Sequence, residues 1–226
     1  MSVTTTGLTR AAGIAAVVAG GIFITVQIGH PPMEVPSVST TEWLVRNSAK
    51  VVMAALALAG ITGMYLRQVR ESGIVGLIGY LLFSVGYLAM LSVAFVAGYV
   101  LPSLATVAPG YVDDILTAAA GGTPTGDIGS MQGAFLLSAF GYLVGGTVFG
   151  IALFRADVLA RWACALLAVG TLITIALPAL PRSFERPFAV PTGVALIGLG
   201  FSLWRNPCPS EPSAPAAVRT EQPAAR

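Results

Sequence analysis

Six long apolar segments dominate this sequence, and they limit the chain to folds that a membrane can hold. A transmembrane α-helix needs about 20 apolar residues to cross the hydrocarbon core of a bilayer. The segments run roughly over residues 11–29, 47–66, 74–101, 131–154, 158–177 and 188–204. Only 10% of the residues are charged, whereas a soluble domain carries about 25%. The sequence therefore predicts an all-α fold, a polytopic transmembrane bundle of six spans within residues 1–205.

The basic residues predict how such a bundle is oriented. An even number of spans places both termini on one side, and cytoplasmic loops are enriched in Lys and Arg. If both termini are cytoplasmic, that side holds Arg10, Arg67, Arg70, Arg155, Arg161, Arg205, Arg219 and Arg226, and the outer side holds Arg46, Lys50, Arg182 and Arg186. This asymmetry favours an N-in, C-in arrangement. The tail over residues 206–226 is rich in Pro, Ala and Ser, and we expect it to be disordered in the cytoplasm.

Two outer connections carry recognisable helix signals. In the first, Ser39 and Glu42 match the S-x-x-E capping box, and Trp43 is expected at the membrane interface. In the second, over residues 102–130, Pro109 and Gly121 bracket a short helix. The segment 74–101 would reach about 42 Å as one helix, so we expect it to tilt or to project beyond the lipid.

The spans are most informative for what they lack. No Asp, Glu, Lys, Arg or His lies near the middle of any apolar segment, and such residues usually mark ion pathways and proton relays. This counts against a proton pump and against a proton-coupled transporter built on a carboxylate. One histidine and two cysteines supply neither a bis-histidine haem nor a four-ligand zinc site. H-E-x-x-H, G-x-S-x-G and P-loop patterns are absent, so we predict no cofactor, no metal site and no catalytic residue.

His30, in "FITVQIGHPP", is the single histidine and stands where the first apolar segment ends before two prolines. A histidine there can cap the last carbonyls of a helix, which is the reading we favour. The alternative is a functional role with the outer carboxylates.

Any site is expected at the outer mouth, because ionisable groups concentrate there. The speculative cluster comprises His30, Glu34, Lys50, Asp113, Asp114, Asp127, Arg182 and Arg186. Lys50 lies one turn inside its span, so it either extends its ammonium outward along its own stem or serves as a buried functional lysine. Asp113 and Asp114 are neighbours on an expected helix and would point about 100° apart, which is poor geometry for a catalytic pair.

Small residues indicate which helices pack closely. Lipid supplies no hydrophobic drive for helix association, so small side chains let backbones approach one another. The fourth segment contains two overlapping small-xxx-small pairs, formed by Gly141, Gly145, Gly146 and Gly150. We therefore expect this segment to be buried against other helices.

Two stretches, "GGTVFGIALFRADVLARWACALLAVG" and "PFAVPTGVALIGLGFSLWR", carry a family resemblance. They resemble uncharacterised small multi-pass membrane proteins of actinobacteria, with a Gly-rich span, an "FR…L.RW" hairpin and a last span that ends in Trp-Arg. The match covers about the last third of the chain. It implies a helical membrane bundle and transfers no catalytic residues.

Three functions are compatible with these features. The favoured one is a non-enzymatic structural, accessory or partner-binding bundle in the bacterial plasma membrane. The others are a facilitative channel or transporter for a small neutral or apolar solute, and a membrane enzyme with an outer-face site. The lipid bilayer is the expected partner, with a protein partner or a homo-oligomer possible; a net charge of +2 is too small to argue for nucleic acid.

Overall fold

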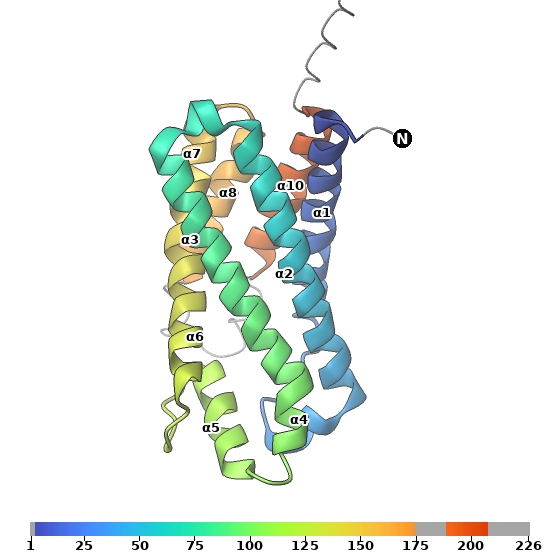
Figure 1. Ribbon diagram of the computed structural model, residues 1–226, viewed down its shortest axis with the longest axis vertical. Helices are drawn as coiled ribbons and strands as arrows, with labels where there is room; N and C mark the ends of the chain where they lie inside the picture. The colour runs from blue at the N-terminus through green and yellow to red at the C-terminus, as the bar shows by residue number, and fades with distance from the viewer. Residues whose placement is uncertain (1–2, 175–188, 208–226) are drawn as a thin grey trace, which may run out of the picture.

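The chain folds into an elongated bundle of helices (Figure 1). The computed structural model describes residues 3–174 and 189–207, and these ranges contain helices, turns and connections but no strand. The elements are α1 (Thr5–Thr25), η1 (Val35–Ser39), α2 (Thr41–Arg67), α3 (Val69–Phe95), η2 (Val96–Val100), α4 (Leu101–Leu104), α5 (Pro109–Ala119), α6 (Ser130–Phe140), η3 (Gly141–Gly145), α7 (Gly146–Ala156), α8 (Arg161–Leu172) and α10 (Ala189–Arg205).

Four helical stretches are long and apolar enough to cross a membrane. They are Thr5–Thr25, Thr41–Arg67, Val69–Leu104 and Ser130–Ala156. The helices α8 and α10 are also apolar but have 12 and 17 residues. The fold is thus a helical bundle of membrane-protein type. The expected spans 158–177 and 188–204 extend in part into residues outside the described ranges. Most of the expected disordered tail, including Cys208, also lies outside these ranges.

Both described ends of the chain lie at the same end of the bundle (Figure 1). There the Arg67 guanidinium donates from Nε to the carbonyl of Asn206, at 2.9 Å, and so joins the end of α2 to the end of α10. We call this the Arg67 end. The opposite end holds the turn after α1, η1, α4 and α5, and we call it the His30 end.

Close approaches between backbones hold the bundle together. The first and last described helices, α1 and α10, pack along each other, and α1 also packs on α2. Gly141 lies against Gly86 on α3, where a Cβ would meet the Gly86 Cα at 2.6 Å, and Gly145 lies against the backbone of Phe83.

Two further glycines of the fourth apolar segment face α8. A Cβ on Gly150 would lie 2.7 Å from the backbone nitrogen of Ala168, and one on Gly146 would lie 2.5 Å from the Thr171 methyl group. The glycines singled out in the sequence thus sit at two different helix contacts. Gly141 and Gly145 contact α3, and Gly146 and Gly150 contact α8.

The third stretch runs almost without interruption from Val69 to Leu104, including the π-helical turn η2. Near its start, Gly73 has a φ of 54° and kinks the helix, a conformation that glycine adopts without a Cβ penalty. Its far end extends into the His30 end, where Leu101 packs with η1 and α5 in a second small core. This core buries Val38, Trp43, Leu101, Val112, Ile115, Leu116 and Ile128.

The start of α2 differs from the expected capping box. The N-cap is Thr40, whose hydroxyl accepts from the Trp43 backbone N–H at 3.2 Å, while Ser39 closes η1. Glu42 does not reach back to the cap and instead pairs with Arg46 at 2.9 Å. Trp43 itself is only 2% exposed, so its ring packs inside the protein, and its level in the bilayer stays a prediction. Thr40 and Ser39 are adjacent residues of similar chemistry, and the 3₁₀ turn decides which of them caps the helix.

Candidate functional site: a cavity at the His30 end

A cavity of ≈ 470 Å³ opens between the helices near the His30 end. Its size lies within the range of about 300–1,000 Å³ that is typical of small-molecule sites. Its lining comes from the end of α1 and the turn after it, from α2, from the α3–η2–α4 stretch, from α5, α6 and η3, and from Thr174 after α8 and Ala189 at the start of α10. Most of the lining is apolar. Four of the six methionines take part, namely Met33, Met53, Met90 and Met131. Unbranched, polarizable thioethers let a wall adapt to ligands of different shape.

One face of α2 supplies most of the polar wall. Trp43, Asn47, Lys50 and Met53 all line the cavity, and spacings of three and four residues place them on the same side of a helix. Trp43 and Asn47 are 2% and 3% exposed. The Asn47 amide donates to the carbonyl of Trp43 at 2.9 Å, one turn earlier in the same helix.

Both π-helical turns in the described residues border this cavity. Val96 and Ala97 belong to η2, and Tyr142 belongs to η3; all three are lining residues. A π-turn displaces backbone groups from the regular ladder and is often found at functional sites. In η2 the carbonyl of Ala97 accepts a 2.7 Å hydrogen bond from the Trp43 indole. The Tyr142 hydroxyl donates to the Thr192 hydroxyl of α10 at 2.9 Å.

His30 and Lys50 meet on the wall of the cavity. Lys50 Nζ lies 3.0 Å from His30 Nε2, and His30 Nδ1 lies 2.8 Å from the carbonyl oxygen of Pro31. A carbonyl only accepts, so Nδ1 carries the ring proton and Nε2 is the acceptor for the lysine ammonium. With this tautomer the contact joins the turn after α1 to α2. The His30 ring also lies edge-on to the ring of Trp43, with centroids 6.1 Å apart.

The expectation that His30 caps the first helix is not met, because another residue does so. The carbonyls of Val26 and Ile28 accept from Arg46 Nη1, at 3.2 and 2.8 Å. Arg46 reaches them from α2, and Gly29 turns the chain away with a φ of 61°. Lys50 reaches toward His30 on the cavity wall, and whether its ammonium extends outward stays a prediction.

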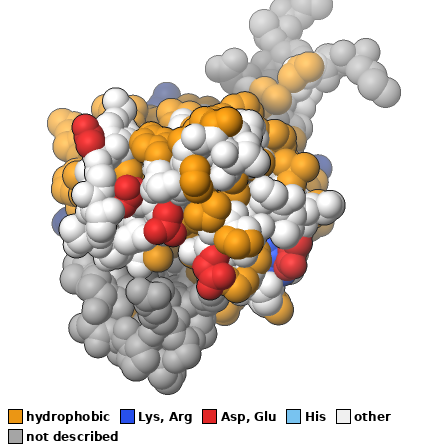
Figure 2. Space-filling view, turned by 90° about the horizontal axis from the view of Figure 1, so that it is seen from below, with side chains coloured by type: hydrophobic (Ala, Val, Ile, Leu, Met, Phe, Trp, Pro, Cys, Tyr) orange, Lys and Arg blue, Asp and Glu red, His pale blue; other side chains and the backbone are white. Residues whose placement is uncertain are grey.

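The four carboxylates of the expected cluster, Glu34, Asp113, Asp114 and Asp127, form no ion pair with His30. In the described residues the ion pairs are Glu42–Arg46 and Asp157–Arg161, so none links His30 to an aspartate. Asp127 accepts from the backbone N–H of Gly129 at 2.8 Å. Asp113 and Glu34 are exposed. Figure 2 shows acidic side chains scattered over this end of the molecule.

Asp114 stabilises the loop that follows α5. Its carboxylate accepts from the backbone N–H groups of Thr125 and Gly126, at 2.7 and 3.1 Å, and from the Thr125 hydroxyl at 3.0 Å. The hydrogen bond from the Thr125 backbone favours the ionised form and holds the pKa of Asp114 below its usual value. Asp114 and Asp127 therefore serve the local backbone. Of the expected polar cluster, only His30 and Lys50 lie together on the cavity, and Arg182 and Arg186 fall outside the described residues.

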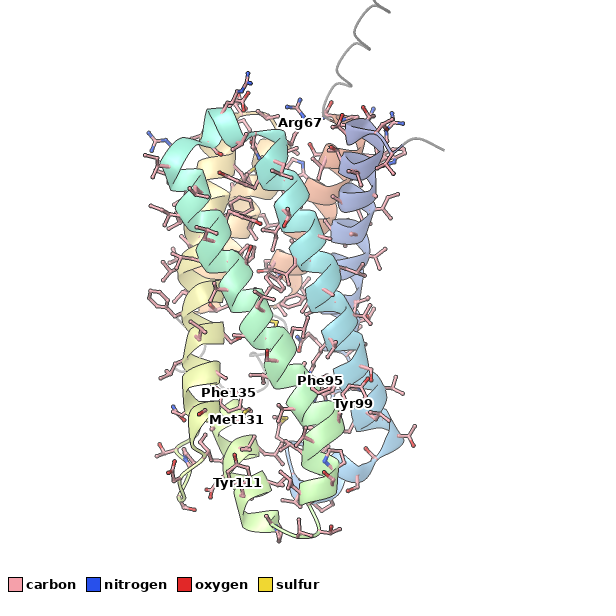
Figure 3. All side chains as sticks on the ribbon, in the orientation of Figure 1. Arg67, Phe95, Tyr99, Tyr111, Met131 and Phe135 are labelled. Carbon is pink, nitrogen blue, oxygen red and sulfur yellow. The ribbon has the colours of Figure 1, made fainter. Side chains whose placement is uncertain are left out.

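A cluster of aromatic side chains packs in the core of the bundle next to the cavity. Phe83 is fully buried and packs on Tyr87, Tyr142 and Phe149, with ring centroids 5.0, 5.9 and 6.3 Å away. Figure 3 shows Met131 and Phe135 on α6, on the side of that helix nearer to α3.

The analysis of the sequence did not predict that apolar residues such as Met131 and Phe135 line a cavity. The spacing of Trp43, Asn47 and Lys50 was the one local signal that could have placed a shared wall on α2.

Comparison with known proteins adds no relative to this description. No protein-family model, no curated protein and no solved structure matches the chain. The function must therefore be argued from the cavity and its residues.

Proposed function

We propose that this chain is a non-enzymatic membrane protein that binds a small apolar or amphipathic molecule in the cavity at the His30 end. The proposed function falls in the class that the sequence favours, a partner-binding bundle. In this proposal the partner is a small molecule. The observation that carries the proposal is the cavity itself, which is lined by several helices of the bundle and joins apolar walls to a few polar groups. That combination is typical of ligand sites.

The proposal includes six spans, with both termini in the cytoplasm of a bacterium. Among the described residues, the Arg67 end carries Arg10, Arg67, Arg70, Arg155, Arg161 and Arg205, whereas the His30 end carries two basic residues, Arg46 and Lys50. Cytoplasmic loops are rich in Lys and Arg, which supports a cytoplasmic Arg67 end. The cavity then lies toward the outer leaflet of the plasma membrane. The resemblance to small actinobacterial membrane proteins agrees with this location.

A facilitative route through the bundle is the weaker candidate. Phe83 packs on Tyr87 and Phe149 in the buried core of the bundle, and none of these three rings lines the cavity. A passing solute would have to displace several packed rings. An enzyme is weaker still, because Asp114 and Asp127 bind backbone groups of their own loop.

The outer surface of α6 leaves room for a protein partner. Leu136, Leu137 and Phe140 are exposed there, and no residue of α6 is buried. Lipid covers such a face in the monomer, and a second copy could replace that lipid.

Trp43 offers a direct test of ligand binding. It lines the cavity, whereas Trp162 and Trp204 are 58% and 44% exposed and do not line it. In a Trp162→Phe/Trp204→Phe background, 10-bromodecanol should quench Trp43 in a saturable manner. Ala94→Phe adds a ring to the buried wall of the cavity and should prevent the saturable quenching, while Ala139→Phe, at an exposed position away from the cavity, should not. Equal quenching in the two variants would overturn the proposal.

A further inference from the structure

We infer that the ligand of this cavity is a neutral amphiphile whose head group donates a hydrogen bond, from a hydroxyl or an amide N–H, to Oδ1 of Asn47. The inference rests on the proposed binding function and adds the chemistry of the head group. It starts from the way in which this one carboxamide is bonded on the wall of the cavity.

Asn47 is a buried polar side chain that lines the cavity. It is 3% exposed, and its Nδ2 donates to the carbonyl of Trp43 at 2.9 Å. Because a carbonyl only accepts, this bond fixes which end of the amide is the nitrogen and leaves Oδ1 as an acceptor. Among the residues that the structure describes, none donates to Oδ1. The site therefore offers an acceptor that a ligand can satisfy.

Contacts with η2 fix the position of this amide. A Cβ on Gly98 would lie 3.0 Å from the Asn47 Cβ, so the base of the side chain packs directly on the π-helical turn. One turn earlier on α2, the Trp43 indole donates to the carbonyl of Ala97 in the same turn. These contacts and the bond from Nδ2 leave Asn47 little freedom to turn Oδ1 elsewhere. The acceptor is thus preorganised, which lowers the entropic cost of binding.

Gln27 supplies a second carboxamide to the lining, from the turn after α1. It is half-buried, and its side chain makes no hydrogen bond to the described part of the chain. A carboxamide both donates and accepts, and so do hydroxyls and amides. Gln27 can therefore complete the hydrogen bonding of a head group whose own proton goes to Asn47.

The lining from α5 and α6 suits the apolar body of such a ligand. Every residue that these two helices contribute is apolar, namely Ile115, Leu116, Ala119, Met131 and Phe135. Their side chains offer a head group no hydrogen bond, whereas a hydrocarbon chain gains free energy by leaving water beside them. The ligand is accordingly oriented with its head toward α2 and its chain toward α5 and α6.

The free acceptor discriminates between head groups. An ionised carboxylate only accepts, so it would leave Oδ1 unpaired. An ammonium donates, but no carboxylate belongs to the described lining to balance its charge in an apolar setting. An ether displaces water from Oδ1 without replacing its hydrogen bond, which lowers affinity. A site that binds a hydroxyl or an N–H in this way discriminates strongly against an analogue that lacks it.

The experiment compares two pairs of neutral amphiphiles in which only the donor differs. One pair is 10-bromodecanol and its methyl ether, and the other is 10-bromodecanamide and its N,N-dimethyl derivative. Quenching of Trp43, as the single tryptophan in neutral detergent, reports binding after correction for partition into protein-free micelles. We expect the donor to bind about tenfold more tightly in at least one pair, which corresponds to about 1.4 kcal/mol. The pair with the larger ratio identifies the head group as a hydroxyl or an amide.

Substitutions then locate the donor at Asn47. Asn47→Leu has a similar size but no acceptor, so the two members of each pair should bind within about twofold of each other. Asn47→Ala removes the acceptor without a branch beside η2, and it should have the same effect. Ser48→Ala is the matched control, because Ser48 bonds the Leu44 carbonyl and the Tyr99 hydroxyl and does not line the cavity. It should leave both ratios unaltered.

The outcomes separate this inference from the proposed function. If the members of each pair bind equally and Ala94→Phe prevents their binding, the cavity binds amphiphiles but the inference about the head group is wrong. If none of the four compounds quenches Trp43 in a saturable manner, the proposed function itself fails. If the preference for the donor persists in Asn47→Leu and Asn47→Ala, the head group is not held at Asn47 and the inference is likewise overturned.

Discussion

The indole of Trp43 donates a 2.7 Å hydrogen bond to the carbonyl of Ala97, a residue 54 positions later in the chain. The acceptor lies in the π-helical turn η2, and the donor is nearly completely buried on α2. One bond therefore joins two long helices at the wall of the cavity. It also gives the displaced carbonyl a partner in an apolar setting, where an unpaired polar group is costly.

Trp43→Phe keeps an aromatic ring but removes the donor, so the Ala97 carbonyl loses this partner. We expect a loss of about 1–3 kcal/mol in the free energy of unfolding, measured as a lower melting temperature in detergent. Trp204→Phe is the control, because that side chain is partly exposed at the other end of the bundle. Equal melting temperatures for the two variants would show that the bond to η2 contributes no stability.

The bilayer explains which features of this fold were predictable. Membrane-length helices need long apolar stretches, and the helices Thr5–Thr25 and Thr41–Arg67 overlap the expected spans 11–29 and 47–66. The short helix after Pro109 was also expected, and it ends at Ala119 just before Gly121, which has a φ of 76°. These features depend on local composition and turn chemistry, which a sequence shows directly.

The cavity depends on how distant helices pack, so it was harder to predict from the sequence. His30 and Lys50 were placed at the same mouth, but the bond between them depends on how the turn after α1 folds back on α2. Arg46 took over the capping expected of His30 because its side chain reaches the carbonyls of another helix. No sequence pattern within the apolar segments predicts the positions of the two π-helical turns. Contacts between distant elements decide all three features.

Gly145→Ala tests the contact between η3 and α3. The added Cβ would overlap the backbone of Phe83 and Leu82, so the two helices must move apart. Overpacking of this kind costs about 1–3 kcal/mol, and the melting temperature should fall accordingly.

Gly133→Ala is the matched control for that substitution. It lies on the preceding helix α6, and nothing is found within 4 Å of the position of its Cβ. Alanine favours a helix over glycine by up to about 1 kcal/mol, so this variant should be as stable as the wild type or slightly more stable. A lower melting temperature for Gly133→Ala than for Gly145→Ala would contradict the packing described for η3.

Arg46→Gln tests the capping of α1 from α2. It removes the hydrogen bonds to the carbonyls of Val26 and Ile28 together with the ion pair to Glu42. Hydrogen bonds to charged groups contribute about 1.5–3 kcal/mol, so amide exchange over residues 26–30 should become faster. Glu42→Gln removes the ion pair alone, and an exposed pair contributes only about 0–1 kcal/mol. Faster exchange of the same size in both variants would assign the effect to the ion pair.

Asp114→Asn tests the loop after α5 through its pH dependence. The pKa of Asp114 is lowered in the folded protein, chiefly by the backbone hydrogen bond from Thr125. Its carboxylate therefore stabilises the fold above the usual pKa of an aspartate, and this stability is lost as the pH falls through the lowered pKa. At pH 7 the variant should melt below the wild type, and the difference should shrink as the pH is taken below 4 and the Asp114 carboxyl of the wild type becomes protonated. Asp113→Asn, at the adjacent exposed position, is the matched control for the loss of one carboxylate at this end of the bundle. A difference between Asp114→Asn and wild type that stays constant with pH would mean that the charge of Asp114 does not hold the loop.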